Sequence, residues 1–209
     1  MTQAVLIFGA GGLAYDILDI IARIGGIEVA GCVVDRAAAS GTPPPPGLRI
    51  YHWDEVSDRA ADFVAVNGIV SPMRRRFLEA AEARQFKFLT LVDPSAQVFP
   101  SAAIGEGSII SAGCIIAAQA RVGRHVLLNR AVTIGHHCEV GDFASCYAGV
   151  NVAGFCRLGA GAEVGIGAVI IERIRVGDGA MIGAGTVLIR DCPPGARMVG
   201  VPARPIGQK

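Results

Sequence analysis

Residues 122–146 read VGRHVLLNRAVTIGHHCEVGDFASC, and within this stretch an apolar residue recurs at every sixth position. The recurring positions are Val122, Leu128, Ile134, Val140 and Cys146. The same spacing runs without a break from Val98 to Leu188, and of these sixteen consecutive positions fifteen are aliphatic and one is cysteine. An α-helix repeats apolar residues every 3.6 positions and a strand every 2, so neither element accounts for a period of six.

A hexapeptide repeat of this kind predicts a parallel β-helix, in which each hexad supplies one short strand and one corner. Three hexads complete a coil, so residues three hexads apart stack on neighbouring coils at a spacing of about 4.8 Å. The repeated aliphatic residue points into a three-sided column, and glycine, which often follows it, permits tight turns. The sixteen hexads predict just over five coils. A glycine-rich disordered tract, the alternative, lacks an aliphatic residue at every sixth position.

The first 93 residues follow a different pattern, in which strand-like and helix-like segments alternate. Strands are expected at residues 4–8, 28–34, 62–66 and 86–92, and helices at residues 13–24 and 72–85. Such alternation predicts a small parallel sheet with helices covering it, which is a Rossmann-like α/β fold. We therefore expect a Rossmann-like domain at residues 1–93 and a parallel β-helix domain at residues 94–209.

The composition excludes several classes of partner. With 19 basic and 18 acidic residues the net charge is +1, which argues against a nucleic-acid or polybasic membrane surface. Hydrophobic residues reach 52%, but no run of about 18 uninterrupted apolar residues exists to insert into a membrane. The N-terminus lacks the basic segment of a signal peptide, so a cytoplasmic location is expected. The six cysteines show no CxxC spacing and are expected to be reduced apolar fillers.

His136 is the candidate catalytic residue of the repeat, because it falls two positions after Ile134, where side chains point outward. Ala118 and Gly154 occupy the stacked positions one coil before and one coil after. Because their side chains are minimal, a surface groove that accommodates a slim ligand is expected beside the imidazole. Histidine accepts and releases protons near neutral pH, which suits a general base. The alternative to a general base is a surface histidine with no functional role.

His137 also faces outward and is a candidate to orient its neighbour, although a solvated residue is the simpler interpretation. A zinc site is not expected, because the two histidines should point apart on an extended segment and no cysteine pair joins them at ligand spacing. We therefore predict no metal.

The N-terminal domain carries a candidate nucleotide site. Gly9-x-Gly11-x-x-Ala14 follows a strand and opens a helix, and Asp35 ends the next strand. In this context glycines let the backbone approach a pyrophosphate, and the acid accepts hydrogen bonds from a ribose or base. Taken alone the motif suggests NAD or FAD, and a purely structural turn is the other interpretation. The three arginines at residues 74–76 are expected on a solvated helix face, with a phosphate contact as the alternative.

The hexad array, residues 129–141 and the tail Gly200-Val201-Pro202-Ala203 together resemble bacterial nucleotide-sugar acetyltransferases. These are left-handed β-helix enzymes of the hexapeptide-repeat superfamily, and the sialic acid O-acetyltransferases are similar. The resemblance covers essentially the whole chain. It implies transfer of an acetyl group from acetyl-CoA to the amino group of a nucleotide-linked amino sugar, a dideoxy sugar being favoured. It also implies a homotrimer whose active sites lie between chains.

The resemblance places the functional residues as follows. The catalytic set is His136 as the base, with His137 and Glu139 as its candidate supports. The acetyl-CoA positions are Gly154, Ile166 and Ala184, along one rising line of coils, together with Ser145; the tail would close over the coenzyme. The nucleotide-sugar positions are Gly11, Gly12, Leu13, Asp35, Asn67 and Gly68.

Three positions depart from the family pattern. An acidic residue commonly follows the base, but here that residue is His137, and Glu139 or Asp142 would have to substitute. A further family histidine corresponds to Ser145, and the histidine common after the glycine pair corresponds to Leu13. O-acetylation of a sugar hydroxyl, a catalytically degenerate nucleotide-sugar-binding scaffold and a nicotinamide-dependent enzyme are the alternative functions.

Overall fold

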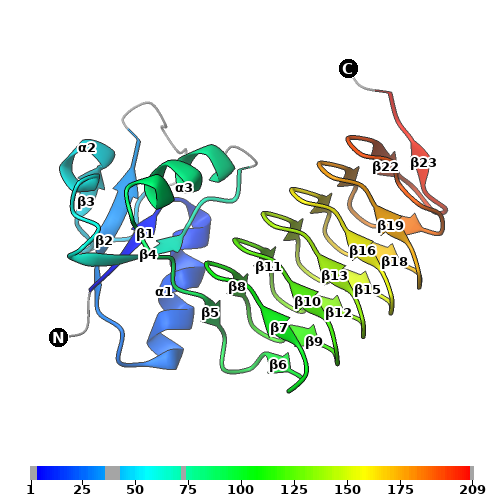
Figure 1. Ribbon diagram of the computed structural model, residues 1–209, viewed down its shortest axis with the longest axis horizontal. Helices are drawn as coiled ribbons and strands as arrows, with labels where there is room; N and C mark the ends of the chain where they lie inside the picture. The colour runs from blue at the N-terminus through cyan, green and yellow to red at the C-terminus, as the bar shows by residue number, and fades with distance from the viewer. Residues whose placement is uncertain (1–3, 36–42, 72–73, 208–209) are drawn as a thin grey trace. The chain divides into compact units, whose positions relative to one another are not determined.

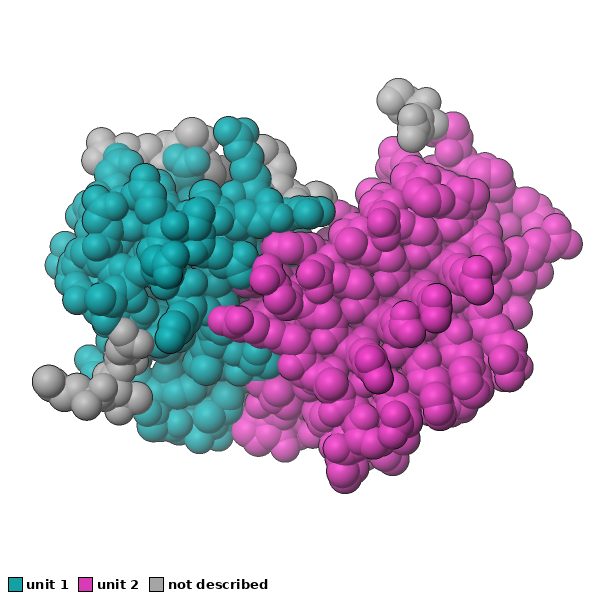
Figure 2. Space-filling view, viewed as in Figure 1, with its two compact units in different colours: residues 1–91 teal, residues 92–209 magenta. Residues whose placement is uncertain are grey.

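The computed structural model of the 209-residue chain describes residues 4–35, 43–71 and 74–207. The chain forms two compact units, Met1–Leu91 and Val92–Lys209, which Figure 2 colours separately. Within the described ranges, no helix combines the length and the apolar character needed to cross a membrane.

Unit 1 contains a parallel sheet, as predicted, and three of its four strands match predicted ones (Figure 1). The strand order is β3-β2-β1-β4, and the strands are β1 (Ala4–Phe8), β2 (Val29–Val34), β3 (Ile50–His52) and β4 (Phe63–Asn67). The helices are α1 (Gly12–Ile24), α2 (Trp53–Val56) and α3 (Arg74–Ala83). Phe8 is fully buried and its ring contacts an aromatic cluster formed by Trp53, Phe77, Phe86 and Phe88. The Rossmann-like prediction for this part of the chain is confirmed.

Two details of unit 1 differ from the prediction. The short elements β3 and α2 were not predicted, because segments this short are too brief to show a period. The strand expected at residues 86–92 is wrong as a continuous element: Phe88 forms only an isolated bridge to Ala65, and β5 (Leu91–Val92) joins a sheet of the repeat. The apolar pattern that suggested a strand has another cause, because the rings of Phe86 and Phe88 pack in the aromatic cluster around Phe8. Residues 72–73 of the predicted helix lie outside the described residues.

Unit 2 is a parallel β-helix with three sheets, built from strands of two or three residues that stack coil upon coil (Figure 1). The first sheet, which we call the charged face, contains β7 (Ala103–Ile104), β10 (Arg121–Val122), β13 (Glu139–Val140), β16 (Arg157–Leu158) and β19 (Arg175–Val176). The second, the apolar face, contains β6 (Gln97–Val98), β9 (Ile115–Ile116), β12 (Thr133–Ile134), β15 (Asn151–Val152), β18 (Val169–Ile170) and β21 (Val187–Leu188).

The third sheet, which we call the third face, contains β5, β8 (Ile109–Ile110), β11 (Leu127–Leu128), β14 (Ser145–Cys146), β17 (Glu163–Val164), β20 (Met181–Ile182), β22 (Arg197–Val199) and β23 (Arg204–Pro205). The last strand, β23, pairs in the antiparallel direction with β22. The prediction of a left-handed parallel β-helix is confirmed.

The strand register follows the predicted stacking of every third hexad. Ile134, for example, pairs with Ile116 on one side and Val152 on the other, and all three side chains are buried inside the column. The recurring glycine has a different role from the one expected. A Cβ atom on Gly135 would lie 2.5 Å from the carbonyl carbon of Ala153 on the next coil. Close approach between coils therefore requires glycine there, whereas residues such as His137 and Phe155 adopt the positive φ of the corners.

Candidate functional site

His136 lies at the corner between strand β12 of the apolar face and strand β13 of the charged face. Residues 135–137 form this corner, and residues 153–155 form the equivalent corner of the next coil; we call the two together the histidine edge. The backbone locks the two corners together, because the Phe155 N–H donates to the His136 carbonyl oxygen at 2.9 Å. The His136 side chain is exposed, as predicted, on a rigid support.

The imidazole of His136 lies directly over the backbone of Gly154. A Cβ atom on Gly154 would stand 2.7 Å from both Cε1 and Nε2 of the ring. Only a residue without a side chain leaves room for the ring in this position. The space predicted for a ligand at Gly154 is therefore occupied by the His136 ring itself, which corrects that expectation.

The two adjacent histidines contact one another through their rings. The Nδ1 atoms of His136 and His137 are 3.2 Å apart, and the ring planes are nearly perpendicular at 88°. The expectation that these side chains point apart is wrong, because His137 has a φ of 57° and does not continue an extended strand. One Nδ1 must carry a proton and the other must accept it, so the contact couples the tautomers of the two rings.

Phe155 completes the histidine edge and was not predicted from the sequence. Its ring stacks on His137 at a centroid distance of 4.9 Å and meets His136 edge-on at the same distance. The guanidinium of Arg173 lies 4.5 Å from the Phe155 ring centroid. His137, Phe155 and Arg173 occupy the same hexad position on three successive coils, so the period itself could have identified this stack.

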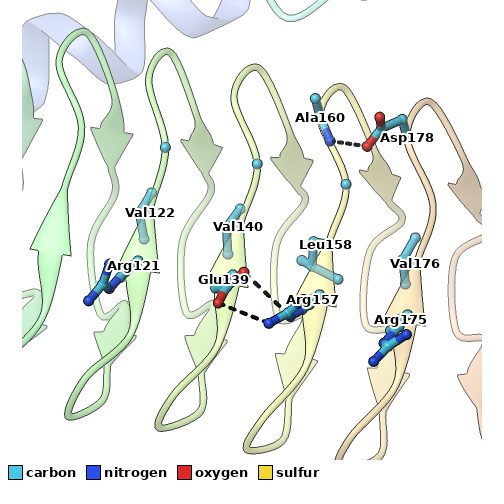
Figure 3. Close-up of a pocket in the computed structure, with 13 residues that line it drawn as sticks. Arg121, Val122, Glu139, Val140, Arg157, Leu158, Ala160, Arg175, Val176 and Asp178 are labelled. Carbon is cyan, nitrogen blue, oxygen red and sulfur yellow. Dashed lines mark hydrogen bonds and ion pairs between the residues drawn. The ribbon is translucent and has the colours of Figure 1, made fainter.

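Glu139 lies on the charged face, where its carboxylate forms an ion pair with Arg157. Figure 3 shows this pair in a row of outward side chains on successive coils, with Arg121 before it and Arg175 after it. The row borders an open groove of about 670 Å³. Asp142, the other acidic candidate, accepts a hydrogen bond from the Arg124 N–H at 2.8 Å. The structure thus places His137, rather than either acid, in contact with the His136 ring.

The predicted coenzyme residues do not lie along one line of coils, which corrects that expectation. Gly154 is on the histidine edge. Ile166 and Ala184, one full coil apart, stack on the edge between the third face and the apolar face, where Ile166 is 61% exposed. Ser145 is 1% exposed and lies in strand β14 of the third face. A step of two hexads moves a position to another edge of the column, and only a step of three hexads returns it to the same edge.

Unit 1 has a cavity of about 830 Å³ at the carboxyl ends of its strands. Gly11, Gly12, Leu13, Asp35 and Gly68 line it, as do Trp53, Asp54, Phe77 and two arginines that were not among the predicted site residues. Strand β1 lies between β2 and β4, so the chain reverses its direction across the sheet here, which is where open α/β sheets bind ligands. Asn67 is outside the lining: it is buried, and its Oδ1 accepts the Ile69 N–H at 3.0 Å.

The arginines at residues 74–76 do not share one environment. Arg74 is only 2% exposed, lines the cavity, and donates from Nη1 to the Val70 carbonyl oxygen at 3.1 Å. Arg75 is exposed and forms an ion pair with Glu79 at 2.8 Å. Arg76 is exposed and also lines the cavity. The expectation of a uniformly solvated face is therefore wrong for Arg74.

All six cysteines are unpaired and buried, in agreement with the predicted filler role. Burial raises the pKa of the Cys32 and Cys114 thiols to about 11 and that of Cys146 to about 12. Cys138 and Cys156 lie behind the histidine edge, where their thiols donate to the Ala153 and Ile171 carbonyl oxygens at 3.0 Å each. The interaction between the two thiols raises the pKa of Cys138 and lowers that of Cys156. Among the residues that the structure describes, no group of three or more histidine, cysteine or acidic side chains could hold a metal ion.

No family model matches the chain. Among solved structures, it is similar to the acetyltransferase domain of PglB from Neisseria gonorrhoeae in complex with acetyl coenzyme A. The identity is 28%, the TM-score is 0.88, and the match covers 99% of this chain and 100% of the other. It is also similar to a histidine-to-asparagine variant of perosamine N-acetyltransferase from Caulobacter crescentus, in complex with CoA and GDP-perosamine. Here the identity is 26%, the TM-score is 0.90, and the coverage is 100% and 99%.

WeeI from Acinetobacter baumannii matches in fold alone, at 19% identity and a TM-score of 0.74, over 98% of this chain and 100% of that one. The similarity to each of these proteins extends through both units. The resemblance drawn from the hexads and the tail is confirmed.

Proposed function

We propose that this chain, a member of the hexapeptide-repeat β-helix acyltransferases, moves an acetyl group from acetyl-CoA to the amino group of a nucleotide-linked amino sugar in the cytoplasm. The observation that carries the proposal is His136: its exposed imidazole rests on the Gly154 backbone and contacts His137 through Nδ1. The similarity over both units to an acetyltransferase domain solved with acetyl-CoA, and to a perosamine N-acetyltransferase solved with CoA and GDP-perosamine, supports the choice of substrates.

In the proposed reaction His136 is the general base. The amine nitrogen attacks the carbonyl carbon of the thioester while Nε2 of His136 takes the proton that the amine loses. A C–N bond forms, the C–S bond breaks, and the leaving thiolate of CoA receives the proton from His136. No acyl-enzyme is needed, and a positioned base of this kind contributes about 10²–10⁴-fold to the rate.

His137 is the proposed positioning residue. If Nδ1–H of His136 donates to Nδ1 of His137, then Nε2 of His136 is unprotonated and ready to accept a proton. The stacked Phe155 ring holds His137 in this orientation. A neutral imidazole stabilises the protonated base less than a carboxylate does, which favours an amine acceptor over a hydroxyl, because an amine is the stronger nucleophile.

The proposed assembly is a homotrimer with the apolar face between chains. Exposed apolar residues lie at the two ends of this face and its flanks: Val98 and Phe99 on the first coil, and Val169, Ile171 and Ile189 on the last coils. Val169, Ile171 and Ile189 lie on neighbouring coils and form an exposed apolar group of the kind that interfaces cover. The histidine edge and the edge that carries Ile166 and Ala184 border the apolar face on opposite sides. A second copy packed on this face would bring one edge of each kind together, and acetyl-CoA would lie between them.

The cavity of unit 1 is the proposed site for the nucleotide. Gly11 and Gly12 open helix α1, and a Cβ atom added at either position would meet no atom within 4 Å, so a ligand has access to the backbone there. Asp35 on the same lining would accept hydrogen bonds from the ribose or base.

The test is thiol release from acetyl-CoA in the presence of UDP-, GDP- and dTDP-linked amino sugars. The proposal predicts stoichiometric CoA release and an N-acetylated product by mass spectrometry with at least one acceptor. Acetylation of a hydroxyl alone would replace the amine assignment. Binding of a nucleotide sugar without calorimetrically detectable binding of CoA would identify a degenerate scaffold instead.

A further inference from the structure

The cavity of unit 1 is lined by charged groups of both signs from separate parts of the chain. Asp35 follows strand β2, and Asp54 lies in helix α2, which follows strand β3. Arg74 and Arg76 come from the first turn of helix α3, which follows strand β4. The glycine turn after β1 lies between these groups, because the strand order is β3-β2-β1-β4. Such an arrangement fits a ligand that carries hydrogen-bond donors at one end and negative charge at the other.

Arg74 is the unusual member of this lining. A guanidinium in a residue that is only 2% exposed is costly to bury, and this one forms part of the wall of a cavity. Its Nη1 donates to the Val70 carbonyl oxygen at 3.1 Å, which fixes the side chain in the cavity wall. An anion in the cavity would accept charge-assisted hydrogen bonds from the guanidinium, and these are about twice as strong as neutral ones.

The helices that open on the cavity reinforce this preference for an anion. Neither α1 nor α3 has an acidic residue in its first turn, and the N-cap of α1, Gly11, provides no side-chain hydrogen bond. Neither helix therefore has a carboxylate in its own first turn at the positive end of its dipole.

We propose that Arg74 and Arg76 bind the diphosphate of the nucleotide sugar, with the nucleoside directed toward Asp35 and Trp53. This assignment rests on the proposed function for the identity of the ligand. Arg74 would act as a fixed donor, because its side chain is buried and its backbone N–H bonds to the Ser71 carbonyl oxygen. Arg76, which is exposed, would close on the phosphates from the solvent side.

Trp53 provides a direct measurement, because it is the single tryptophan of the chain and lines the cavity. Titration of the full-length protein with GDP, UDP and dTDP should change its fluorescence, and the matching monophosphates should bind at least tenfold more weakly. Arg76→Ala should weaken diphosphate binding by about tenfold or more, the effect of losing a charge-assisted hydrogen bond, and change monophosphate binding less than twofold. Arg75→Ala, whose partner is Glu79 outside the cavity, is the matched control and should bind like the parent.

The results separate this assignment from the acetyl transfer. If Arg76→Ala keeps the parental preference for diphosphates, or if no nucleotide changes the Trp53 signal, the arginine assignment is wrong even where the parent protein acetylates a nucleotide sugar. If diphosphate binding depends on Arg76 but no acceptor is acetylated, the arginine assignment stands and the proposed reaction fails. Arg74→Lys, which keeps the charge but loses the forked geometry, should lie between the parent and Arg76→Ala and checks that the buried position also contributes.

Discussion

Replacement of Gly154 by alanine tests whether the position of the His136 ring matters for catalysis. The new Cβ would stand 2.7 Å from Cε1 and Nε2 of the imidazole, which is about 0.7 Å inside the shortest ordinary contact of 3.4 Å. The ring must therefore move by a comparable distance. A misplacement of about 1 Å at a reacting group costs about 10²-fold in rate, or about 2.7 kcal/mol of activation free energy.

The folded structure should tolerate the same change. Gly154 has an ordinary backbone conformation rather than a positive φ, and the exposed His136 side chain can move toward solvent. Alanine also reduces the conformational freedom of the unfolded chain, which is worth about 0.4–1 kcal/mol. We expect Gly154→Ala to lower kcat about 10²-fold while the melting temperature changes by only a few degrees.

Steady-state kinetics with acetyl-CoA and an acceptor, together with thermal unfolding, measure both effects. Gly207→Ala is the matched control, because a Cβ atom there meets nothing within 4 Å, and it should keep parental kinetics. Wild-type kcat in Gly154→Ala would refute the reasoning, since the imidazole could then act from a displaced position.

Three further predictions concern the histidine pair, the assembly and the buried thiols. His137→Asn, whose side chain tolerates a positive φ, should lower kcat about tenfold or more while KM for acetyl-CoA stays constant, as steady-state kinetics would measure; a changed KM alone would contradict the positioning role. The double variant Val169→Glu/Ile171→Glu places carboxylates on the apolar face and should convert a trimer to monomers in light scattering, with loss of turnover; an unchanged mass would exclude this face. Burial favours the neutral form of these thiols in the folded protein. Their contribution to stability is therefore complete below pH 9, the ordinary pKa of a thiol, and is lost as the pH rises toward the higher pKa of the folded state. We therefore expect the free energy of unfolding to fall by about 1 kcal/mol per thiol at pH 10, and urea titrations at pH 8 and pH 10 would measure it for variants of Cys32, Cys114 and Cys146.

The repeat was predictable from the sequence because its period of six places one buried aliphatic residue in every hexad. Ile134 illustrates this, since its coil neighbours Ile116 and Val152 are also members of the series. The same arithmetic placed His136 outward and Gly154 beside it, which the structure bears out.

Contacts that depend on local backbone conformation were not predictable. The contact between His136 and His137 requires a positive φ at His137, and the hexad pattern does not distinguish this conformation from an extended one. The separation of Gly154 from the edge of Ile166 and Ala184 could have been deduced, because Gly154 and Ile166 are two hexads apart rather than a full coil. In unit 1, the burial of Arg74 depends on how helix α3 packs, and a run of three arginines carries no sign of it.

A single-turnover experiment with His136→Asn tests the proposed mechanism most directly. The protein, in excess, would be mixed with acetyl-CoA and an accepted nucleotide-linked amino sugar, and the release of CoA would be recorded over time. Calorimetry would measure the affinity of the same sample for CoA. Asparagine fits the corner but cannot take up a proton, so we predict a rate about 10²-fold or more below the parent with unchanged CoA affinity. A parental rate from this variant would show that the imidazole above Gly154 is not the base.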